Sequence, residues 1–238
     1  MDHNRMPSIS VVIPTLDEEM YIGGCLRALR EQDFDGDYEI IVVDGGSRDK
    51  TVGIARKLAD RVIVSKGACP VGAARNIGAD AAEAGIVAFI DADTLASQKW
   101  LRSINDSIND GVMGAAGPVL PLNGSRKDLF FCESQNWVAE NILTKSKVFL
   151  FGGLNCAYRK DAFMKAGGFS EDVKIFEDIN LSLRLSKLGR LRYNGKMAVC
   201  TSTRRLRKYG YARMVALYAA NWVLLPLGKN IGNYPPVR

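Results

Sequence analysis

Short runs of β-branched and aliphatic residues alternate with helical patterns through residues 9 to 90 of the chain. The runs that predict strands lie at 9–13, 38–43, 62–64 and 86–90. Between them, apolar residues recur at helical spacing after residue 22, and residues 72–84 form an Ala-rich helical pattern. Strands and helices that alternate at this pitch predict parallel β-α-β units with right-handed crossovers. Because the strands are apolar throughout, the sheet is expected to be covered on both faces. The fold class we expect is therefore α/β, with a Rossmann-like, mostly parallel central sheet flanked by helices.

The second half of the chain is less regular. It predicts, in order, a strand at 113–119, a helix at 129–143, a strand and turn at 149–155, a short helix at 159–166 and a helix that begins at residue 177. In that last helix Ile179, Leu183 and Leu188 are expected to face inward. No repeat, low-complexity tract or linker divides the sequence, so we expect a single domain over residues 1–238.

Two acidic residues, Asp44 and Asp91, directly follow predicted strands. In open α/β sheets, ligands bind in the crevice beyond the carboxyl ends of the strands. The sequence therefore predicts that both carboxylates point toward one crevice at that edge.

The second of these acids belongs to the triplet Asp91-Ala92-Asp93. Hard divalent cations such as Mg²⁺ or Mn²⁺ typically bind one or two carboxylates together with substrate phosphates. A bound metal can then neutralise charge on a leaving diphosphate. The alternative is a solvated, acidic turn that caps a helix starting at Thr94.

Asp44 is followed by Gly45-Gly46-Ser47. Glycines allow the backbone to approach a ligand closely, and Asp44 could accept a hydrogen bond from a nucleobase or a ribose hydroxyl. The alternative is a turn with Ser47 or Asp49 as helix N-cap, which leaves Asp44 unexplained. Neither a G-x-G-x-x-G nor a P-loop pattern occurs, so those two nucleotide sites are not predicted.

Two cations precede or begin the third predicted helix. Arg75 lies early in that helix, where the positive end of the helix dipole favours anions, and Lys66 lies in the loop before it. Both are candidates for an anion site, and the alternative for each is an exposed surface cation.

The late chain adds acids and arginines. Glu177 and Asp178 begin a predicted helix, where acids stabilise the dipole; the functional alternative makes Asp178 a general base within reach of an acceptor hydroxyl. Arg204 and Arg205 could hold a diphosphate or a phosphorylated acceptor, since arginine binds phosphate in a bidentate fork. The alternative is a solvated basic face.

Composition excludes several kinds of site. The five cysteines are widely spaced and odd in number, which argues against a disulfide framework or a zinc knuckle and suits a reducing cytoplasm. The single histidine, His3, argues against a His-rich metal site or a Ser/His/Asp triad. The net charge of +6 favours anionic partners, but no nucleic-acid-binding pattern occurs, so no nucleic-acid partner is expected.

The N-terminus carries no apolar signal segment, and no run reaches the ~18 apolar residues of a spanning helix. The longest apolar stretch, residues 214–227, is interrupted by Asn221 and Pro226. It could be a buried helix or could lie on a membrane surface. With the nearby arginines it suggests a lipid-linked or membrane-surface acceptor, and a cytoplasmic protein that contacts the cytoplasmic membrane face.

Six segments, taken in order, resemble those of the family 2 glycosyltransferases, which have the GT-A fold. They are VVIPTLDEE (11–19), IIVVDGGSRDKT (40–51), GAARNIGA (72–79), FIDADT (89–94), GGLNCAYRKDAFMKAGGF (152–169) and FEDINLSLRL (176–185). The ordered set spans nearly the whole chain. It implies a nucleotide-sugar half over about residues 1–110 and an acceptor half over about residues 111–238 that ends in an apolar helix.

The resemblance also implies donor-binding roles. The residues expected to cradle the base and ribose are Pro14, Thr15, Glu18 and Asp44, with Arg75 near the nucleotide or its phosphates. Asp91, Ala92 and Asp93 match the D-x-D motif of the family, which holds Mg²⁺ or Mn²⁺, with Asp93 as the more direct ligand.

On the acceptor side, Asp178 matches the catalytic base of the family's E-D motif, preceded by Glu177, and Gly153 and Asn155 match the loop beside the acceptor. The implied mechanism is a single displacement with inversion. Asp178 would take the proton of the acceptor hydroxyl as its oxygen attacks the anomeric carbon, through an oxocarbenium-like transition state. The metal and the arginines would stabilise the departing nucleoside diphosphate.

The sequence departs from many family members because no histidine occurs in the late segment 201–205. In many family members this histidine helps to bind the metal or phosphate. Here either Arg204 or Arg205 replaces its charge, or Asp93 and phosphate hold most of the metal. The long spanning tails of processive relatives are absent too, which favours a non-processive transferase. Two alternatives are a sugar-phosphate nucleotidyltransferase, whose Gly-rich G-x-x-R loop is replaced here by IPTLDEE, and a non-catalytic nucleotide- or lipid-binding module.

Overall fold

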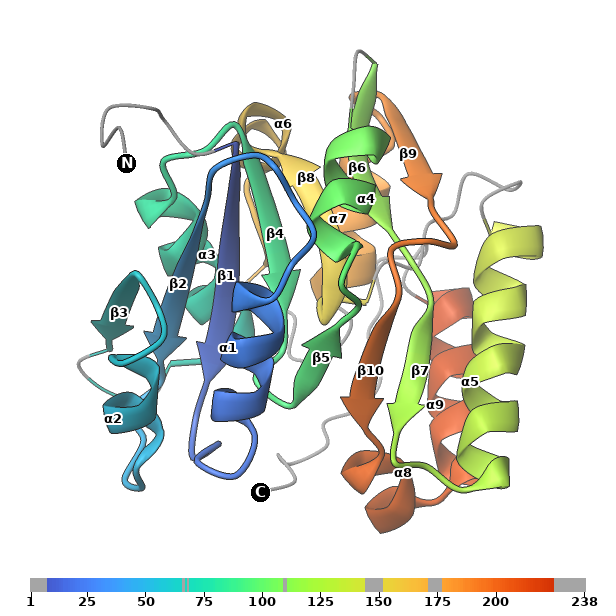
Figure 1. Cartoon of the computed structure of the whole chain (residues 1–238). Helices are drawn as coiled ribbons and strands as arrows, with labels where there is room; N and C mark the ends of the chain where they lie inside the picture. Colours follow the sequence, from blue (N-terminus) through green and yellow to red (C-terminus); the bar gives the residue numbers. More distant parts are fainter. Residues whose placement is uncertain are drawn as a thin grey trace.

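The structure is a computed structural model that describes residues 8–65, 67, 69–108, 111–143, 152–170 and 177–224 (Figure 1). Three predicted features lie outside these residues. They are Lys66, the start of the strand expected at 149–155 and the end of the apolar stretch at 214–227.

A seven-stranded sheet forms the centre of the molecule, in the order β3-β2-β1-β4-β8-β6-β9 (Figure 1). Its strands are β1 (Ile9–Thr15), β2 (Tyr38–Asp44), β3 (Arg61–Val64), β4 (Ile86–Ile90), β6 (Val112–Ala116), β8 (Asn155–Arg159) and β9 (Arg190–Tyr193). Neighbours pair in parallel except where β8 pairs with β4 and with β6. The predicted α/β class and mostly parallel sheet are confirmed.

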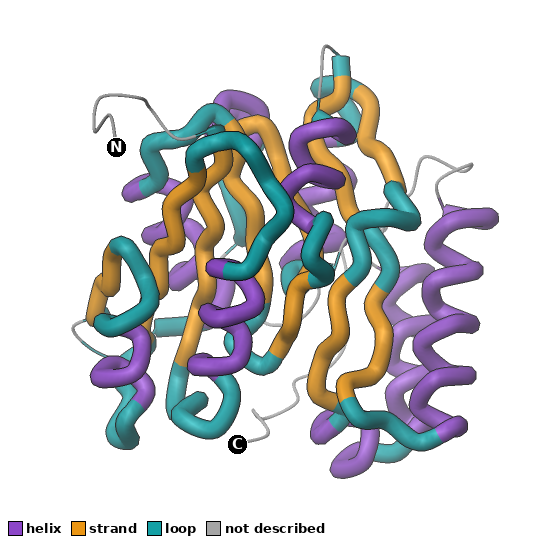
Figure 2. Tube along the Cα trace, viewed as in Figure 1, coloured by secondary structure: helices purple, strands orange, loops and turns teal. Residues whose placement is uncertain are grey.

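Helices flank this sheet (Figure 2). They are α1 (Ile22–Arg30), α2 (Thr51–Ala55), α3 (Val71–Ala81), α4 (Trp100–Ser107), α6 (Lys160–Lys165) and α7 (Glu177–Leu185). The remaining helical elements lie at one end of the molecule (Figure 1): α5 (Arg126–Val138), the π-helical turn η1 (Ala139–Leu143), α8 (Arg204–Tyr209) and α9 (Tyr211–Leu224). Within the described part of the chain, none of them is long and apolar enough to cross a membrane.

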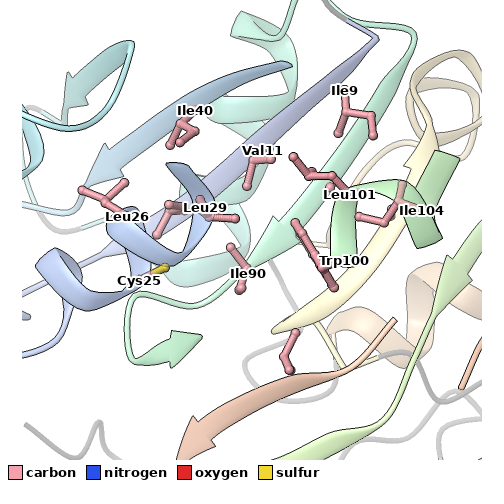
Figure 3. Close-up of a cluster of buried hydrophobic side chains, with 14 of the residues drawn as sticks. Ile9, Val11, Cys25, Leu26, Leu29, Ile40, Ile90, Trp100, Leu101 and Ile104 are labelled. Atoms are coloured by element: carbon pink, nitrogen blue, oxygen red, sulfur yellow. The ribbon is translucent and has the colours of Figure 1, made fainter. Parts of the chain in front are cut away.

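Successive side chains of β1 point to opposite faces of the sheet, and they belong to two separate core clusters. Val11 packs with Leu26 of α1 and Trp100 of α4 in one cluster of fully buried side chains (Figure 3). Val12, the next residue, lies in the second cluster with Phe163 of α6 and Leu185 of α7. Burying such a side chain contributes roughly 1.5–3 kcal/mol, so both faces of the sheet are stabilised by helices, as the apolar strands predict.

A smaller, three-stranded sheet stands beside the large one (Figure 1). In it β10 (Val199–Ser202) pairs antiparallel with β5 (Thr94–Ala96) and parallel with β7 (Val119–Leu122). β5 follows the Asp91-Ala92-Asp93 turn, and α8 follows β10. This sheet therefore brings the start of α8 to the D-x-D turn.

Some predicted elements are wrong in detail. The strand expected at 113–119 is two strands, β6 and β7, which lie in different sheets with Pro118 between them. A strand that was not expected, β8, runs from residue 155, the end of the expected turn, to residue 159, where the short helix was expected to begin; its small residues Cys156 and Ala157 are buried between β4 and β6. In α7, Leu183 is only half-buried; Leu181 and Leu185 are buried with Ile179 instead. Leu188 follows the end of α7, and it is partly buried against the second core cluster.

Candidate active site

The carboxyl edge of the large sheet carries the predicted donor residues. Thr15 at the end of β1 pairs in register with Asp44 at the end of β2, and Asp91 follows β4, the other neighbour of β1. Pro14 and Thr15 are buried in β1. The Thr15 hydroxyl has no hydrogen-bond partner among the described residues. Buried hydroxyls are normally paired, so this group is one that a bound ligand could satisfy.

Asp44 is fully buried and anchors its own turn. Its Oδ2 accepts from the backbone N–H groups of Gly46 and Ser47 at 3.0 and 2.9 Å, and its Oδ1 accepts from the Ser47 hydroxyl at 2.5 Å. Gly46 adopts φ +98°, a conformation that favours glycine. The turn thus accounts for Asp44, and its contact with a base or ribose stays a prediction.

Side chains that follow β2, at residues 47–51, hydrogen-bond the backbone of the loop that follows β1, at residues 17–19. The N–H of Asp17 donates to the Ser47 hydroxyl and that of Glu18 to the Thr51 hydroxyl, both at 2.8 Å. Asp49 accepts from the N–H of Glu19 at 3.0 Å and from that of Thr51 at 2.9 Å. Ser47 and Asp49 therefore join the two loops, and neither is the N-cap residue of α2, which is Lys50.

Arg75 is buried, which excludes the surface alternative for it. Its Nη2 donates to Asp91 Oδ1 at 2.8 Å and its Nη1 to Glu177 Oε1 at 2.7 Å. The guanidinium also lies 5.3 Å from the ring centroid of Phe169, a cation–π distance. Its Nε has no partner among the described residues. Arg75 thus ties the D-x-D turn to the start of α7, 102 residues away in sequence from Arg75.

Asp178 lies at the start of α7, held by two backbone N–H groups. Its Oδ2 accepts from Gly153 and its Oδ1 from Ile179, each at 2.8 Å. A Cβ on Gly153 would lie 2.5 Å from Arg75 Cζ, so only glycine fits beside this arginine. Burial, and then the negative charge of Glu177, raise the pKa of Asp178 to about 7.

Arg204 connects two of the predicted donor acids. Its guanidinium forms a two-pronged ion pair with Glu18, in which Nη1 lies 3.0 Å from Oε2, and its Nη2 lies 3.2 Å from Asp93 Oδ2. The same guanidinium lies 5.0 Å from the ring centroid of Tyr21. Burial, and then the charge of Asp91, raise the pKa of Asp93 to about 6, which Arg204 partly offsets. Arg205, the next residue, is exposed.

Ala92 is buried between the two aspartates, and the chain continues from them into a strand. β5 begins at Thr94, so the alternative of a capped helix at that residue is wrong. The Thr94 hydroxyl donates to Thr201 Oγ1 at 2.8 Å, which fixes the turn against β10.

Asn155, expected in the loop beside the acceptor, makes internal contacts, and its proximity to an acceptor stays a prediction. Its side chain is buried, accepts from Trp100 Nε1 at 2.8 Å, and donates to the carbonyls of Met197 and Pro118 at 2.8 and 3.2 Å. Because both amide hydrogens are used internally, its observed contacts are structural.

Two aromatic residues of the site, Tyr21 and Phe169, were not predicted from the sequence. Both pack against arginine guanidinium groups. No local pattern marks them, because each depends on an arginine that is distant in sequence.

Comparisons with known proteins decide the family. The model of "Glycosyl transferase family 2" matches residues 10–167. The chain belongs to glycosyltransferase family 2. The resemblance seen in the sequence is thereby confirmed.

Among curated relatives of this family 2 protein, the glycosyltransferase AglE of Haloferax volcanii is 28% identical over 196 residues, covering 78% of this chain and 64% of AglE. The validoxylamine A glucosyltransferase of Streptomyces hygroscopicus subsp. limoneus is 34% identical over 107 residues, covering 42% of this chain and 24% of that protein. The chain thus spans less than two thirds of the length of either relative.

Solved structures show the same fold. Residues 1–349 of Staphylococcus aureus TarS align with a TM-score of 0.66 at 22% identity, covering 84% of this chain and 62% of that one. The mannosyltransferase PcManGT of Pyrobaculum calidifontis aligns with a TM-score of 0.72 at 21% identity, covering 98% of this chain and 67% of that one. The predicted GT-A architecture is confirmed.

Proposed function

We propose that this family 2 protein is an inverting, non-processive glycosyltransferase that moves a sugar from a nucleoside-diphosphate sugar to an acceptor hydroxyl. The observation that carries the proposal is a chain of contacts across the site. Asp178 is held beside Gly153 and Arg75, and Arg75 reaches Asp91 at 2.8 Å. Across Ala92, Asp93 is linked through Arg204 to Glu18. Acids from three separate segments, Glu18, the Asp91–Asp93 turn and Asp178, thereby converge on one region.

The acids fit a divalent cation that is bound largely through substrate oxygens. Within the described residues, no group of three or more His, Cys, Asp or Glu side chains could hold a metal ion. Mg²⁺ and Mn²⁺ commonly take one or two carboxylates plus phosphate oxygens instead. Asp93 is partly buried near Asp91 and Glu18, whose charges help to raise its pKa. Asp93 with Asp91 would hold the cation, which when bound would supply neutralising charge for a departing diphosphate.

Asp178 is the proposed general base. Its raised pKa places the carboxylate near the optimum for accepting a proton at neutral pH. The acceptor hydroxyl gives its proton to Asp178 while its oxygen bonds to the anomeric carbon. The bond to the nucleoside diphosphate breaks on the opposite face of the sugar, which inverts the configuration. The N–H groups of Gly153 and Ile179 orient the carboxylate for this transfer.

The ligands bound in structures of similar fold support a nucleotide-sugar donor. One structure of Staphylococcus aureus TarS is a complex with UDP-GlcNAc, and that of PcManGT is a complex with GDP-Man and Mn²⁺. We therefore propose a donor of this class, with Pro14, Thr15, Glu18 and Asp44 around the nucleoside.

We further propose an acceptor that is lipid-linked or at a membrane surface, reached by a cytoplasmic protein that binds the membrane peripherally. Two features support it. The helix α8 carries four basic residues and no acidic one, and α5 exposes Phe130 and Trp137 at 75% and 59%. Basic side chains attract anionic lipids, and exposed aromatic side chains can insert into the membrane interface.

A screen of nucleotide-sugars tests the function. Thermal unfolding would be followed with UDP-, GDP- and dTDP-sugars, each with and without Mn²⁺. A ligand that binds the native state alone raises the melting temperature, so one base series should stabilise the protein, and more strongly with Mn²⁺. If none of these donors shifts the melting temperature in either condition, the proposal is wrong.

A further inference from the structure

A second feature of the molecule, apart from the D-x-D acids, is an open cavity of about 570 Å³ beside α8. Three cations line it, Arg204, Arg207 and Lys208, together with the hydroxyl residues Ser202 and Thr203 and the ring of Tyr21. Leu122, at the end of β7, also lines it. No carboxylate belongs to the described residues that line this cavity.

The three cations share one face of the helix because residues three and four apart are neighbours on a helix surface. Arg204, Arg207 and Lys208 have this spacing in α8. The main chain helps to position Arg207, whose Nη2 donates to the Asn123 carbonyl at 3.4 Å.

Their charges are compensated unequally. Arg204 lines the cavity but is paired with Glu18 and Asp93, so its charge is largely compensated. Arg207 lies 3.8 Å from Asp128, and its side chain is 60% exposed. Lys208 makes no ion pair with any described residue. The cavity therefore has an excess of positive charge that comes mainly from Arg207 and Lys208.

We propose that this cavity is an anion site that binds a phosphate group of the acceptor. The inference rests on the proposed transferase function and names the class of its acceptor: a hydroxyl compound that carries a phosphate or diphosphate. Arginine and lysine on one face, with hydroxyl donors beside them, match the several oxygens and the charge of a phosphate. The donor diphosphate is expected at Asp93, which does not line the cavity.

Inorganic pyrophosphate in the presence of EDTA is a probe that separates the two sites. Without a divalent cation, Asp91, Asp93 and Glu18 disfavour an anion at the donor site, so we expect pyrophosphate to bind at the basic cavity instead. Calorimetry should detect binding to the full chain. Because hydrogen bonds to charged groups contribute about 1.5–3 kcal/mol, R207Q/K208Q should lower the affinity for pyrophosphate about tenfold or more. As a control, Lys127→Gln on α5 removes one exposed charge outside the cavity and should change the affinity for pyrophosphate by less than about twofold.

Two further probes distinguish the sources of the phosphate. If the acceptor is a lipid phosphate, the wild-type chain should bind vesicles of phosphatidylcholine with phosphatidic acid, and R207Q/K208Q should not bind them. If it is soluble, glycerol phosphate should compete with pyrophosphate while these vesicles do not bind. Both results support the site.

The inference is overturned if the wild-type chain does not bind pyrophosphate in EDTA, or if R207Q/K208Q binds it like wild type. It is also overturned if R207Q/K208Q loses nucleotide-sugar binding with Mn²⁺ to the same extent, because the cavity would then be part of the donor site. Failure of the wild-type chain to bind any nucleotide-sugar would instead count against the proposed function. Circular dichroism confirms that each variant is folded.

Discussion

At the scale of single residues, the environment of Asp178 makes a prediction about pH. Its pKa is raised to about 7 by burial and by Glu177, and a base acts only when it is deprotonated. The value of kcat/KM should therefore fall as the pH drops through about 7 and level off above it. Asp178→Asn should lower kcat by roughly 10²–10⁴-fold.

The donor dissociation constant separates a chemical role of Asp178 from a structural one. Asp178→Asn should bind the nucleotide-sugar about as well as the wild-type chain does, and its residual activity should lose the inflection near pH 7. A variant that keeps both the wild-type rate and its pH profile would contradict the assignment.

Arg204 lies where its charge neutralises Glu18 and Asp93 before any donor binds. A divalent cation alone must compete with this guanidinium for Asp93. Arg204→Gln should therefore strengthen the binding of Mn²⁺ alone, and it should weaken the binding of the nucleotide-sugar with Mn²⁺ because a phosphate partner is lost. Each change should be about tenfold, the size of one charged hydrogen bond.

Calorimetric titrations of Mn²⁺, with and without the donor, measure both changes caused by Arg204→Gln. Lys208→Gln removes the same charge from the same helix without touching Asp93 and serves as the control. Equal Mn²⁺ affinity in wild type and Arg204→Gln would show that Arg204 does not compete for Asp93.

At the scale of elements, the loop before β8 and the start of α7 meet around Gly153. A Cβ there would lie 2.5 Å from the Cζ of Arg75, which two carboxylates hold in place. Gly153→Ala should therefore destabilise the protein by about 1–3 kcal/mol, the usual cost of overpacking. It should also reduce kcat, because Gly153 orients Asp178.

Urea unfolding measures the stability of Gly153→Ala against a matched glycine. A Cβ added at Gly53 in α2 would meet no atom within 4 Å, so Gly53→Ala should be neutral or stabilising by up to about 1 kcal/mol. If both variants have the stability of the wild-type chain, the packing at Arg75 is looser than described.

The strands and helices of the first half could be predicted because their periodicity is local. The strands at 9–13, 38–43, 62–64 and 86–90 all occur, and Asp44 and Asp91 follow two of them as expected. The three-stranded sheet could not be predicted, since it joins Thr94 to Thr201, 107 residues apart. No local pattern records that pairing.

The same distinction applies within the site. The order of the motifs predicted roles for Asp93 and Asp178, but it did not show that Arg75 is buried between Asp91 and Glu177. It also did not show that the side chain of Asn155 is hydrogen-bonded to the buried Trp100 and to two backbone carbonyls. Contacts of this kind depend on long-range packing.

At the scale of the whole molecule, α5, α8 and α9 lie together at one end (Figure 1). The Tyr211 hydroxyl at the start of α9 donates to Asp128 of α5 at 3.0 Å. Phe130 and Trp137 are exposed on α5, whereas Trp100 is fully buried. The protein should therefore bind anionic vesicles, less tightly at high salt, and the fluorescence of Trp137 should shift to shorter wavelength.

Replacing both aromatic residues tests this surface. F130S/W137S should weaken vesicle binding by about tenfold or more, because each buried aromatic side chain contributes roughly 1.5–3 kcal/mol. Met164→Ser, an exposed apolar residue on α6, should have no effect. Vesicle binding that is unchanged in F130S/W137S would exclude α5 as the contact.

The convergence of the acids on one donor site is tested most directly by calorimetry of the nucleotide-sugar that stabilises the protein best. With Mn²⁺ present, the wild-type chain should bind it, and Asp93→Asn should bind it at least about tenfold more weakly, since a buried charged contact is lost. Without Mn²⁺, this difference between the two proteins should largely disappear. If Asp93→Asn binds the donor with Mn²⁺ as tightly as the wild-type chain does, the assignment of these acids to a donor site is contradicted.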